Sequence, residues 1–380
     1  MTPLLWSVNL FVLSSTICAT MVFLCGAKRL EIALATVLGV TLGALFHIPA
    51  NFPPAQVMIW LAWWGVGGFL ITTAGIYRTQ TDRGARMRLV RKMAFTPVAA
   101  LIGNLLVTVS AKLTPFTLDR YLYAADGSFG FQPGFACRAL LMRHEWLRLT
   151  SGIAYVNLPV LAMALYLLVH RRNPADASRV VRLLSAVGIA GYCMYYFFPA
   201  AGSEVVLGSK FPFHPPDISS LSLEPIRVAF APRNFMPSLH TAWCLAICWS
   251  ARTLTRVWRT ILMAIVALTL LYTLSCHYLV DMVAAVPFTL AVYAAVENRM
   301  PWNDPARRLA LCAGAACFAA WLGVLRFGTA LLLVSPVISW TAFALTVALS
   351  WYCLYAEPAV NECTPIATEE DLSLSSALVT

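Results

Sequence analysis

Residues 260–296 read TILMAIVALTLLYTLSCHYLVDMVAAVPFTLAVYAAV, and this stretch decides the class of fold. It is 37 residues long and holds one charged residue, Asp281. A membrane-spanning helix needs about 20 apolar residues, so the stretch is too long for one crossing and suits two. Four polar residues interrupt it near the middle: Thr273, Ser275, His277 and Asp281. We therefore expect two spanning helices joined by a tight turn at the membrane surface.

The whole chain has the composition of a membrane protein. Of its 380 residues, 60% are hydrophobic and 12% are charged, whereas soluble domains average about 45–50% and 25%. This excludes a water-soluble fold, a disordered chain, a coiled coil and a disulfide-stapled secreted module. We predict an all-α polytopic membrane protein with about 11 transmembrane helices. Apolar stretches put these helices near residues 4–25, 32–48, 56–76, 94–111, 151–169, 181–199, 237–251, 256–273, 277–297, 309–326 and 329–356.

The basic residues predict how these helices are oriented. The formal net charge is +10, but most Lys and Arg lie in short loops between apolar runs, so we expect contacts with membrane lipids and no nucleic-acid partner. The loops of one face carry 18 Lys and Arg, and those of the other face carry nine. Cytoplasmic loops are enriched in basic residues, so the first face is predicted to be cytoplasmic. His240 and His277 then lie on the extracytoplasmic face, either periplasmic or lumenal.

Two long segments lie on that extracytoplasmic face. In residues 112–150, apolar residues at helical spacing predict a helix lying in the membrane interface. The members of this stripe are Phe135, Ala139, Met142, Trp146 and Leu149. Residues 201–236 are rich in proline and predict an ordered but irregular loop. The acidic and serine-rich tail, 357–380, is expected to be disordered.

His277 and Asp281 form the first constellation with chemical potential. They are four residues apart, so they share one face of a helix. A carboxylate there accepts the ring N–H of the histidine, fixes its tautomer and leaves the other nitrogen free to act as a nucleophile. The alternative is a structural His–Asp pair that caps a helix at the interface, and spacing alone does not separate the two interpretations.

The second constellation is RNFMPSLHT, residues 233–241, directly before an apolar helix. Pro and Ser are ordinary residues at a helix start, which is the structural interpretation. The functional interpretation is an anion site, because the amides of the first turn, the helix dipole and the Ser238 hydroxyl all favour a phosphate. Arg233 would add a bidentate clamp and His240 a proton donor. Together, the two constellations offer the parts of phosphoryl transfer without a metal.

The same residues carry a resemblance to a known family. PSLH at 237–240 and HYLVD at 277–281 resemble the paired motifs of the type-2 phosphatidic acid phosphatase superfamily. Within it the chain is most similar to the inositol phosphorylceramide synthase (inositolphosphotransferase) branch. FPAAG at 198–202 resembles the FPxA stretch of that branch, and TLDRYL at 117–122 is similar to its interfacial segment. The resemblance covers about residues 94–297 and implies a six-helix catalytic core.

The resemblance implies a role for each matching residue. His277 would attack phosphorus and form a phosphohistidine, with Asp281 orienting it. His240 would protonate the leaving alcohol. Ser238 and the amides that follow it, starting at Leu239, would hold the phosphate. The scheme implies no metal and no cofactor, and the eleven cysteines, which form no CxxC pair, are expected to be packing thiols.

The chain also departs from the phosphatase branch. That branch has PSGH where this chain has Leu239, and it has Ser-Arg where this chain has Leu270 and Leu271. Its upstream KxxxxxxRP motif is absent from this sequence. These departures leave Arg233 as the predicted phosphate ligand, with Lys112, Arg120 and Lys210 as weaker candidates on the same face.

The sequence therefore predicts a membrane-embedded lipid phosphotransferase, with lipid phosphate phosphatase as the alternative. Its partners would be a lipid phosphoester, an alcohol or water as acceptor, and membrane lipids. A polytopic transporter is the second alternative, because intramembrane His and Asp residues also occur in carriers. A scaffold without catalytic activity is the third. The predicted organisation is N-terminal helices in 1–93, the catalytic core in 94–297, C-terminal helices in 298–356 and the tail.

Overall fold

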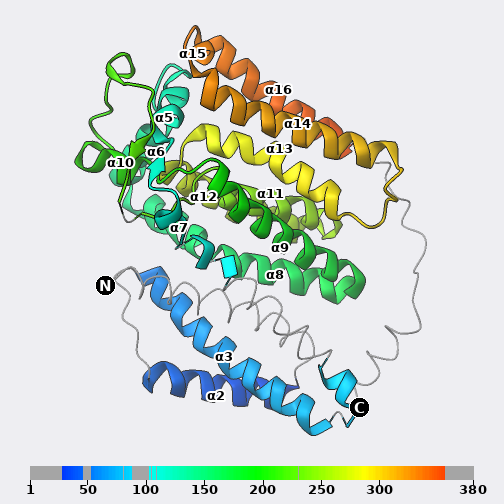
Figure 1. The fold of residues 1–380 in the computed structure, drawn as a ribbon. Helices are drawn as coiled ribbons and strands as arrows, with labels where there is room; N and C mark the ends of the chain where they lie inside the picture. The colour runs from blue at the N-terminus through cyan, green and yellow to red at the C-terminus, as the bar shows by residue number, and fades with distance from the viewer. Residues whose placement is uncertain are drawn as a thin grey trace.

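A computed structural model describes residues 28–45, 53–79, 81–87, 102–103, 105–107, 109–229 and 231–355. Helices dominate these residues (Figure 1). They are α2 (Arg29–Leu45), α3 (Pro53–Thr79), α5 (Asp119–Gly127), α6 (Pro133–Arg143), α7 (Glu145–Val156), α8 (Leu158–Arg172), α9 (Pro174–Phe197), α10 (Ser203–Leu207), α11 (Leu239–Ser250), α12 (Arg256–Cys276), α13 (Leu279–Val296), α14 (Pro305–Phe327), α15 (Thr329–Leu332) and α16 (Pro336–Tyr355). Two short strands, β1 (Phe116–Thr117) and β2 (Ile226–Arg227), pair antiparallel, with Phe116 opposite Arg227.

Five helices in the described part of the chain are long and apolar enough to cross a membrane: α9, α12, α13, α14 and α16. The pair α7–α8 makes a sixth if the two helices form one bent span. The prediction of an all-α integral membrane protein is thus confirmed, whereas the predicted total of about 11 spans is not. The predicted span 4–25 lies outside the described residues.

Three predicted spans differ from the observed helices. The expected helix 151–169 is bent by 60° between α7 and α8. Pro159 follows this break and has no amide hydrogen to continue a helix. The expected helix 237–251 is present as α11 but has 12 residues, which at 1.5 Å per residue is too short to cross alone. The expected helix 329–356 divides into α15 and α16, and the second begins at Pro336.

The tight turn predicted in the deciding stretch is confirmed. Helix α12 ends at Cys276 and α13 begins at Leu279, so two residues, His277 and Tyr278, join them. The predicted interfacial helix in 112–150 is wrong as a single element. His144, with φ −121° and ψ 85°, separates α6 from α7, and a stripe read at constant helical spacing cannot continue across that break.

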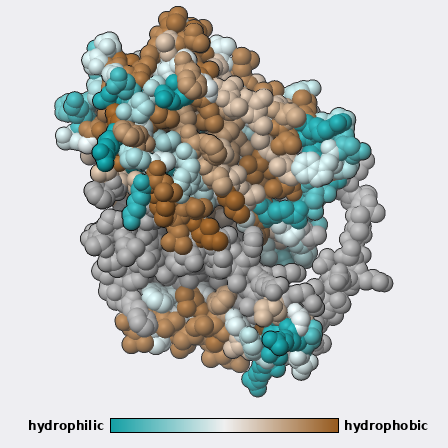
Figure 2. All heavy atoms as spheres, in the orientation of Figure 1, coloured by the Kyte–Doolittle hydropathy of each residue, from teal (hydrophilic) through white to brown (hydrophobic). Residues whose placement is uncertain are grey.

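The long helices form one bundle with two polar ends. Helices α9, α11, α12, α13, α14 and α16 run alongside one another, and the short helices α5, α6 and α10 gather at one end of them (Figure 1). Figure 2 shows hydrophilic residues at the two ends of these helices and hydrophobic residues on the band between them. The loop 201–236 is irregular, as predicted, and lies at the same end as the α12–α13 turn.

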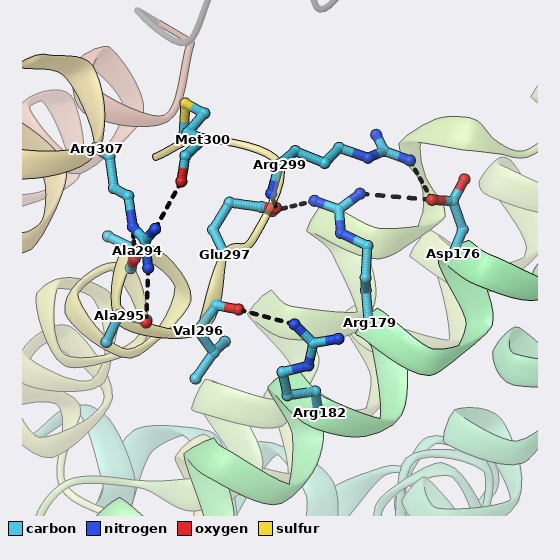
Figure 3. A network of polar contacts seen from close by, with 10 residues as sticks. All are labelled: Asp176, Arg179, Arg182, Ala294, Ala295, Val296, Glu297, Arg299, Met300 and Arg307. Carbon is cyan, nitrogen blue, oxygen red and sulfur yellow. Dashed lines mark hydrogen bonds and ion pairs between the residues drawn. The ribbon is translucent and has the colours of Figure 1, made fainter. Parts of the chain in front are cut away.

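The opposite end of α13 is held by cations (Figure 3). The Arg307 guanidinium donates to the carbonyls of Ala294 at 2.9 Å, Ala295 at 3.0 Å and Met300 at 2.6 Å. These include carbonyls of the last helical turn, which have no partner within the helix. Arg179 of α9 pairs with Glu297, just after α13. The C-terminal end of α13 is therefore fixed to α14 and α9.

Candidate catalytic site

His277 and Asp281 meet at the turn between α12 and α13. His277 ends α12, and its amide donates to the Thr273 carbonyl at 2.8 Å. Asp281 lies in the first turn of α13. The Nδ1 atom of His277 is 3.1 Å from Oδ2 of Asp281, and both side chains are buried. The carboxylate thus engages one ring nitrogen and leaves Nε2 for other chemistry.

His240 joins this pair from another helix. It lies in the first turn of α11, and its ring centroid is 6.2 Å from that of His277, at an interplanar angle of 62°. The ring of Tyr155 stacks on His240 with centroids 3.9 Å apart. The structure therefore brings together the three residues predicted to be catalytic, from positions up to 41 apart in the sequence.

Ser238 begins α11 and links it to α13. Its Oγ accepts from the Thr241 amide at 3.4 Å and from the Thr241 hydroxyl at 3.1 Å, as an N-cap does. The Ser238 amide donates to the carbonyl of Asp281 at 3.3 Å. The starts of both helices consequently adjoin at the histidines, where their dipoles favour an anion.

The position of the Leu239 side chain does not suit contact with a substrate. It is buried in the apolar core. A Cβ at Gly191 of α9 would lie 2.2 Å from Leu239 Cδ2, so the leucine occupies the space that this glycine leaves. Any contact of Leu239 with a phosphate would come from its backbone amide.

Arg233 is held by backbone carbonyls. Its guanidinium donates to Thr114 at 2.9 Å, Ala231 at 2.5 Å, Pro115 at 3.3 Å and Val228 at 2.5 Å. Four of its five N–H groups are thereby used, and the predicted bidentate clamp on phosphate would require breaking at least one bond. Arg233 instead ties the segment before α11 to the segment that enters β1.

The weaker cationic candidates are peripheral. The side chains of Lys112 and Lys210 are exposed. Arg120 donates to the Ser222 carbonyl at 3.3 Å. In the part of the chain that the structure describes, no hydrogen bond or ion pair joins any of the three to His240 or His277.

Two buried acids on α5, which the sequence analysis did not single out, position the site. Asp126 accepts from the amides of Leu279 at 2.8 Å and Val280 at 3.0 Å, so it caps α13 from outside the helix. Asp119 accepts from the Tyr278 hydroxyl at 3.1 Å. The two acids are seven residues apart, two turns of one helix face. They fix the second residue of the α12–α13 turn and the first two residues of α13.

Burial raises the pKa of both acids. Burial raises the pKa of Asp126 to about 8, although the amides of Val280 and Leu279 oppose the shift. For Asp119 the hydrogen bonds from Ala201, Gly202 and Tyr278 oppose the shift.

Asp119 also connects the FPAAG segment to His277. Its carboxylate accepts from the amides of Ala201 at 2.9 Å and Gly202 at 2.7 Å. Gly202 has φ +90°, and a Cβ there would lie 2.1 Å from the Phe235 ring. Phe235 in turn lies against His277, with ring centroids 4.4 Å apart. Gly202 therefore supplies both the left-handed backbone and the room that Phe235 needs.

One family of known proteins is similar to this chain in sequence. Residues 120–295 match the family model of the PAP2 superfamily. The match supports membership of that superfamily for this part of the chain, and it includes His240, His277 and Asp281. It does not distinguish the inositol phosphorylceramide synthase branch within the superfamily. No curated protein and no solved structure matches the chain.

This family match is consistent with a phosphatase or phosphotransferase that acts on lipid phosphates in a membrane. No group of three or more His, Cys, Asp or Glu side chains suited to a metal occurs among the described residues.

Proposed function

We propose that the protein is a membrane-embedded lipid phosphotransferase, similar to inositol phosphorylceramide synthase, that works through a phosphohistidine. One observation carries the proposal: His277 is 3.1 Å from Asp281, and the His240 ring lies 6.2 Å from the His277 ring. A nucleophile with an orienting carboxylate thus faces a second histidine that can exchange a proton.

The reaction has two steps. The Nε2 lone pair of His277 attacks phosphorus and displaces the lipid alkoxide, which takes a proton from His240. An acceptor hydroxyl then gives its proton to His240 while its oxygen attacks the phosphohistidine and releases His277. Asp281 holds the His277 tautomer throughout, and the starts of α11 and α13 stabilise the anion. We assign this catalytic core to 94–297, between helices in 1–93 and 298–356.

Lipid phosphate phosphatase is the second candidate, because water can replace the alcohol at the same phosphohistidine. A transporter fits less well. The His240–His277–Asp281 cluster lies at helix ends, while carriers bind their cargo near the middle of the membrane.

The test is to incubate purified protein with defined lipid phosphoesters labelled at phosphorus. Released phosphate and new phosphorus-containing lipids are followed together. Acid quenching should trap an acid-labile phosphoenzyme in wild type and none in His277→Ala. A phosphoenzyme that persists in His277→Ala would remove His277 as the nucleophile.

His240 has its own test. His240→Gln should slow turnover of the lipid substrate far more than turnover of an aryl phosphate, because an aryloxide leaves without a proton. Equal losses with both substrates would reject the general-acid role.

A further inference from the structure

A phosphoryl group at this site needs positive charge that the histidine motifs do not supply. Negative charge spreads over the phosphoryl oxygens during transfer, and cationic side chains usually stabilise it. Arg233 is already bonded to four carbonyls. The cation must therefore come from another element close to the histidines.

Helix α6 packs directly on the turn that holds His277. A Cβ at Gly134 would lie 3.1 Å from the carbonyl oxygen of His277 and 3.4 Å from that of Leu274. One turn on, the Cys137 thiol donates to the Leu271 carbonyl at 3.2 Å. The glycine thus allows α6 to lie along the last turns of α12.

Arg138 lies four residues after Gly134, on the same face of α6. Its guanidinium carbon is 5.9 Å from the centroid of the Tyr272 ring. The aromatic contacts continue from there to the site: Tyr272 to Tyr155 at 5.0 Å, then Tyr155 to His240 at 3.9 Å. Arg138 is consequently at the end of an aromatic row that reaches His240.

The positive charge of the Arg138 guanidinium is not neutralised by an ion pair in the described part of the chain. It is half-buried, and no carboxylate lies within 4.0 Å of it among residues 109–229 and 231–355. Cys276, next to His277, and Glu204 act on it electrostatically. A hydrogen bond with the Tyr272 side chain also acts on it. By contrast, Arg148 pairs with the Glu145 carboxylate at 2.5 Å.

We propose that Arg138 binds the phosphoryl oxygens of a lipid phosphoester beside His240 and His277. The inference rests on the function proposed above and names the cation of that site. An arginine suits the task because its planar guanidinium donates two parallel hydrogen bonds to an oxyanion.

The kinetic test compares Arg138→Gln and Arg138→Lys with Arg143→Gln, an exposed arginine on the same helix. Arg138→Gln should lower kcat/KM for a lipid phosphoester by about 10- to 100-fold and weaken inhibition by orthovanadate by a similar factor. Arg138→Lys should recover part of both, and Arg143→Gln should match wild type. Equal constants in Arg138→Gln and Arg143→Gln would overturn the inference.

A second measurement does not depend on how the variants fold. Wild-type protein is treated with phenylglyoxal, and modification of each arginine is followed by mass spectrometry. Orthovanadate should slow modification of Arg138 and leave Arg143 unaffected; equal rates with and without vanadate would overturn the inference. If wild type turns over no lipid phosphoester, the proposed function fails and this inference fails with it. If wild type is active and Arg138 is insensitive in either test, the inference alone fails.

Discussion

The backbone amide of Ser238 donates to the carbonyl of Asp281 at 3.3 Å, so the first turn of α11 is joined to the first turn of α13. The contact involves main-chain atoms, and no side chain is needed to make it. It holds the helix that carries His240 against the helix that carries Asp281. The positive ends of two helix dipoles thereby converge near the histidines, which favours an anionic group at this position.

Asp281→Asn should disturb the orientation of His277 without destabilising the fold. The main-chain link to Ser238 survives the substitution, whereas an amide can present its NH2 to the His277 ring and favour the wrong tautomer. We expect kcat to fall by about 100- to 10,000-fold, as in other oriented-histidine enzymes, with a Tm in detergent close to that of wild type. An unchanged kcat would show that Asp281 does not orient His277.

Asp126 should make stability depend on pH. Its pKa is raised to about 8 by burial, while an aspartate in an unfolded chain ionises near pH 4. Between those values the folded chain binds a proton that the unfolded chain has lost, so this residue lowers stability as the pH rises through the window. Asp126→Asn cannot titrate, so the Tm of wild type relative to this variant should fall from pH 5 to 8 and level off above.

At pH 5, Asp126→Asn should be the less stable protein. An amide side chain has one acceptor oxygen for the amides of Leu279 and Val280, so one hydrogen bond is lost, at about 1 kcal/mol. Asp217→Asn serves as the control, because Asp217 is exposed and hydrogen bonds from Ser219 lower its pKa. Its Tm should parallel that of wild type over the same range. A wild-type curve parallel to that of Asp126→Asn would contradict the prediction.

Gly202→Ala should disturb His277 through Phe235. The new methyl would need a left-handed backbone at φ +90° and would lie 2.1 Å from the Phe235 ring. We expect a loss of about 1–3 kcal/mol in stability from the backbone alone and a fall in activity as Phe235 moves. Gly208→Ala is the matched control, since Gly208 also has positive φ, at +53°, but nothing lies within 4 Å of its Cβ position. Equal loss of activity in both variants would exclude crowding of Phe235 as the cause.

Hydropathy was enough to predict the α12–α13 turn and the helical class. Residues 260–296 are too long for one crossing, and the polar interruption lies where the turn is observed. The break at His144 lies in the polar stretch Arg143-His144-Glu145, and a stripe counted at constant helical spacing passes over it. The bend between α7 and α8 is a local backbone event inside apolar sequence. Neither break changes the average hydropathy from which the spans are predicted.

The residues of the site that lie in short motifs can be predicted from the sequence. His277 and Asp281 meet because residues four apart share a helix face, and His240 joins them because both motifs begin helices at one end of the bundle. Asp126 lies 153 residues from Leu279, and no local pattern indicates that contact. Arg233 was assigned to phosphate because of its sequence neighbours, while its partners at Thr114 and Pro115 are distant in sequence.

The orientation of the bundle is open to a labelling experiment. The excess of basic residues on the opposite loops predicts that 201–236 is extracytoplasmic. Ser219 is exposed in this loop, so Ser219→Cys in a background without native cysteines should react with an impermeant maleimide in intact cells. Asn303→Cys, in the loop that follows the spanning helix α13, should react only after permeabilisation. The reverse pattern would put the histidines on the cytoplasmic face.

The choice between transfer and hydrolysis depends on how dry the site is. Leu239 packs in the core and does not line the site, but aromatic rings cover both histidines: Phe235 lies 4.4 Å from His277, and Tyr155 lies 3.9 Å from His240. The His277 side chain is 5% exposed. A phosphohistidine between such walls meets water rarely, so a bound alcohol competes for it. We therefore expect polyols or lipid alcohols to lower the release of inorganic phosphate and to yield a new phosphorus-containing lipid in equal amount. Constant phosphate release across a broad acceptor panel, with no new lipid, would identify a phosphatase.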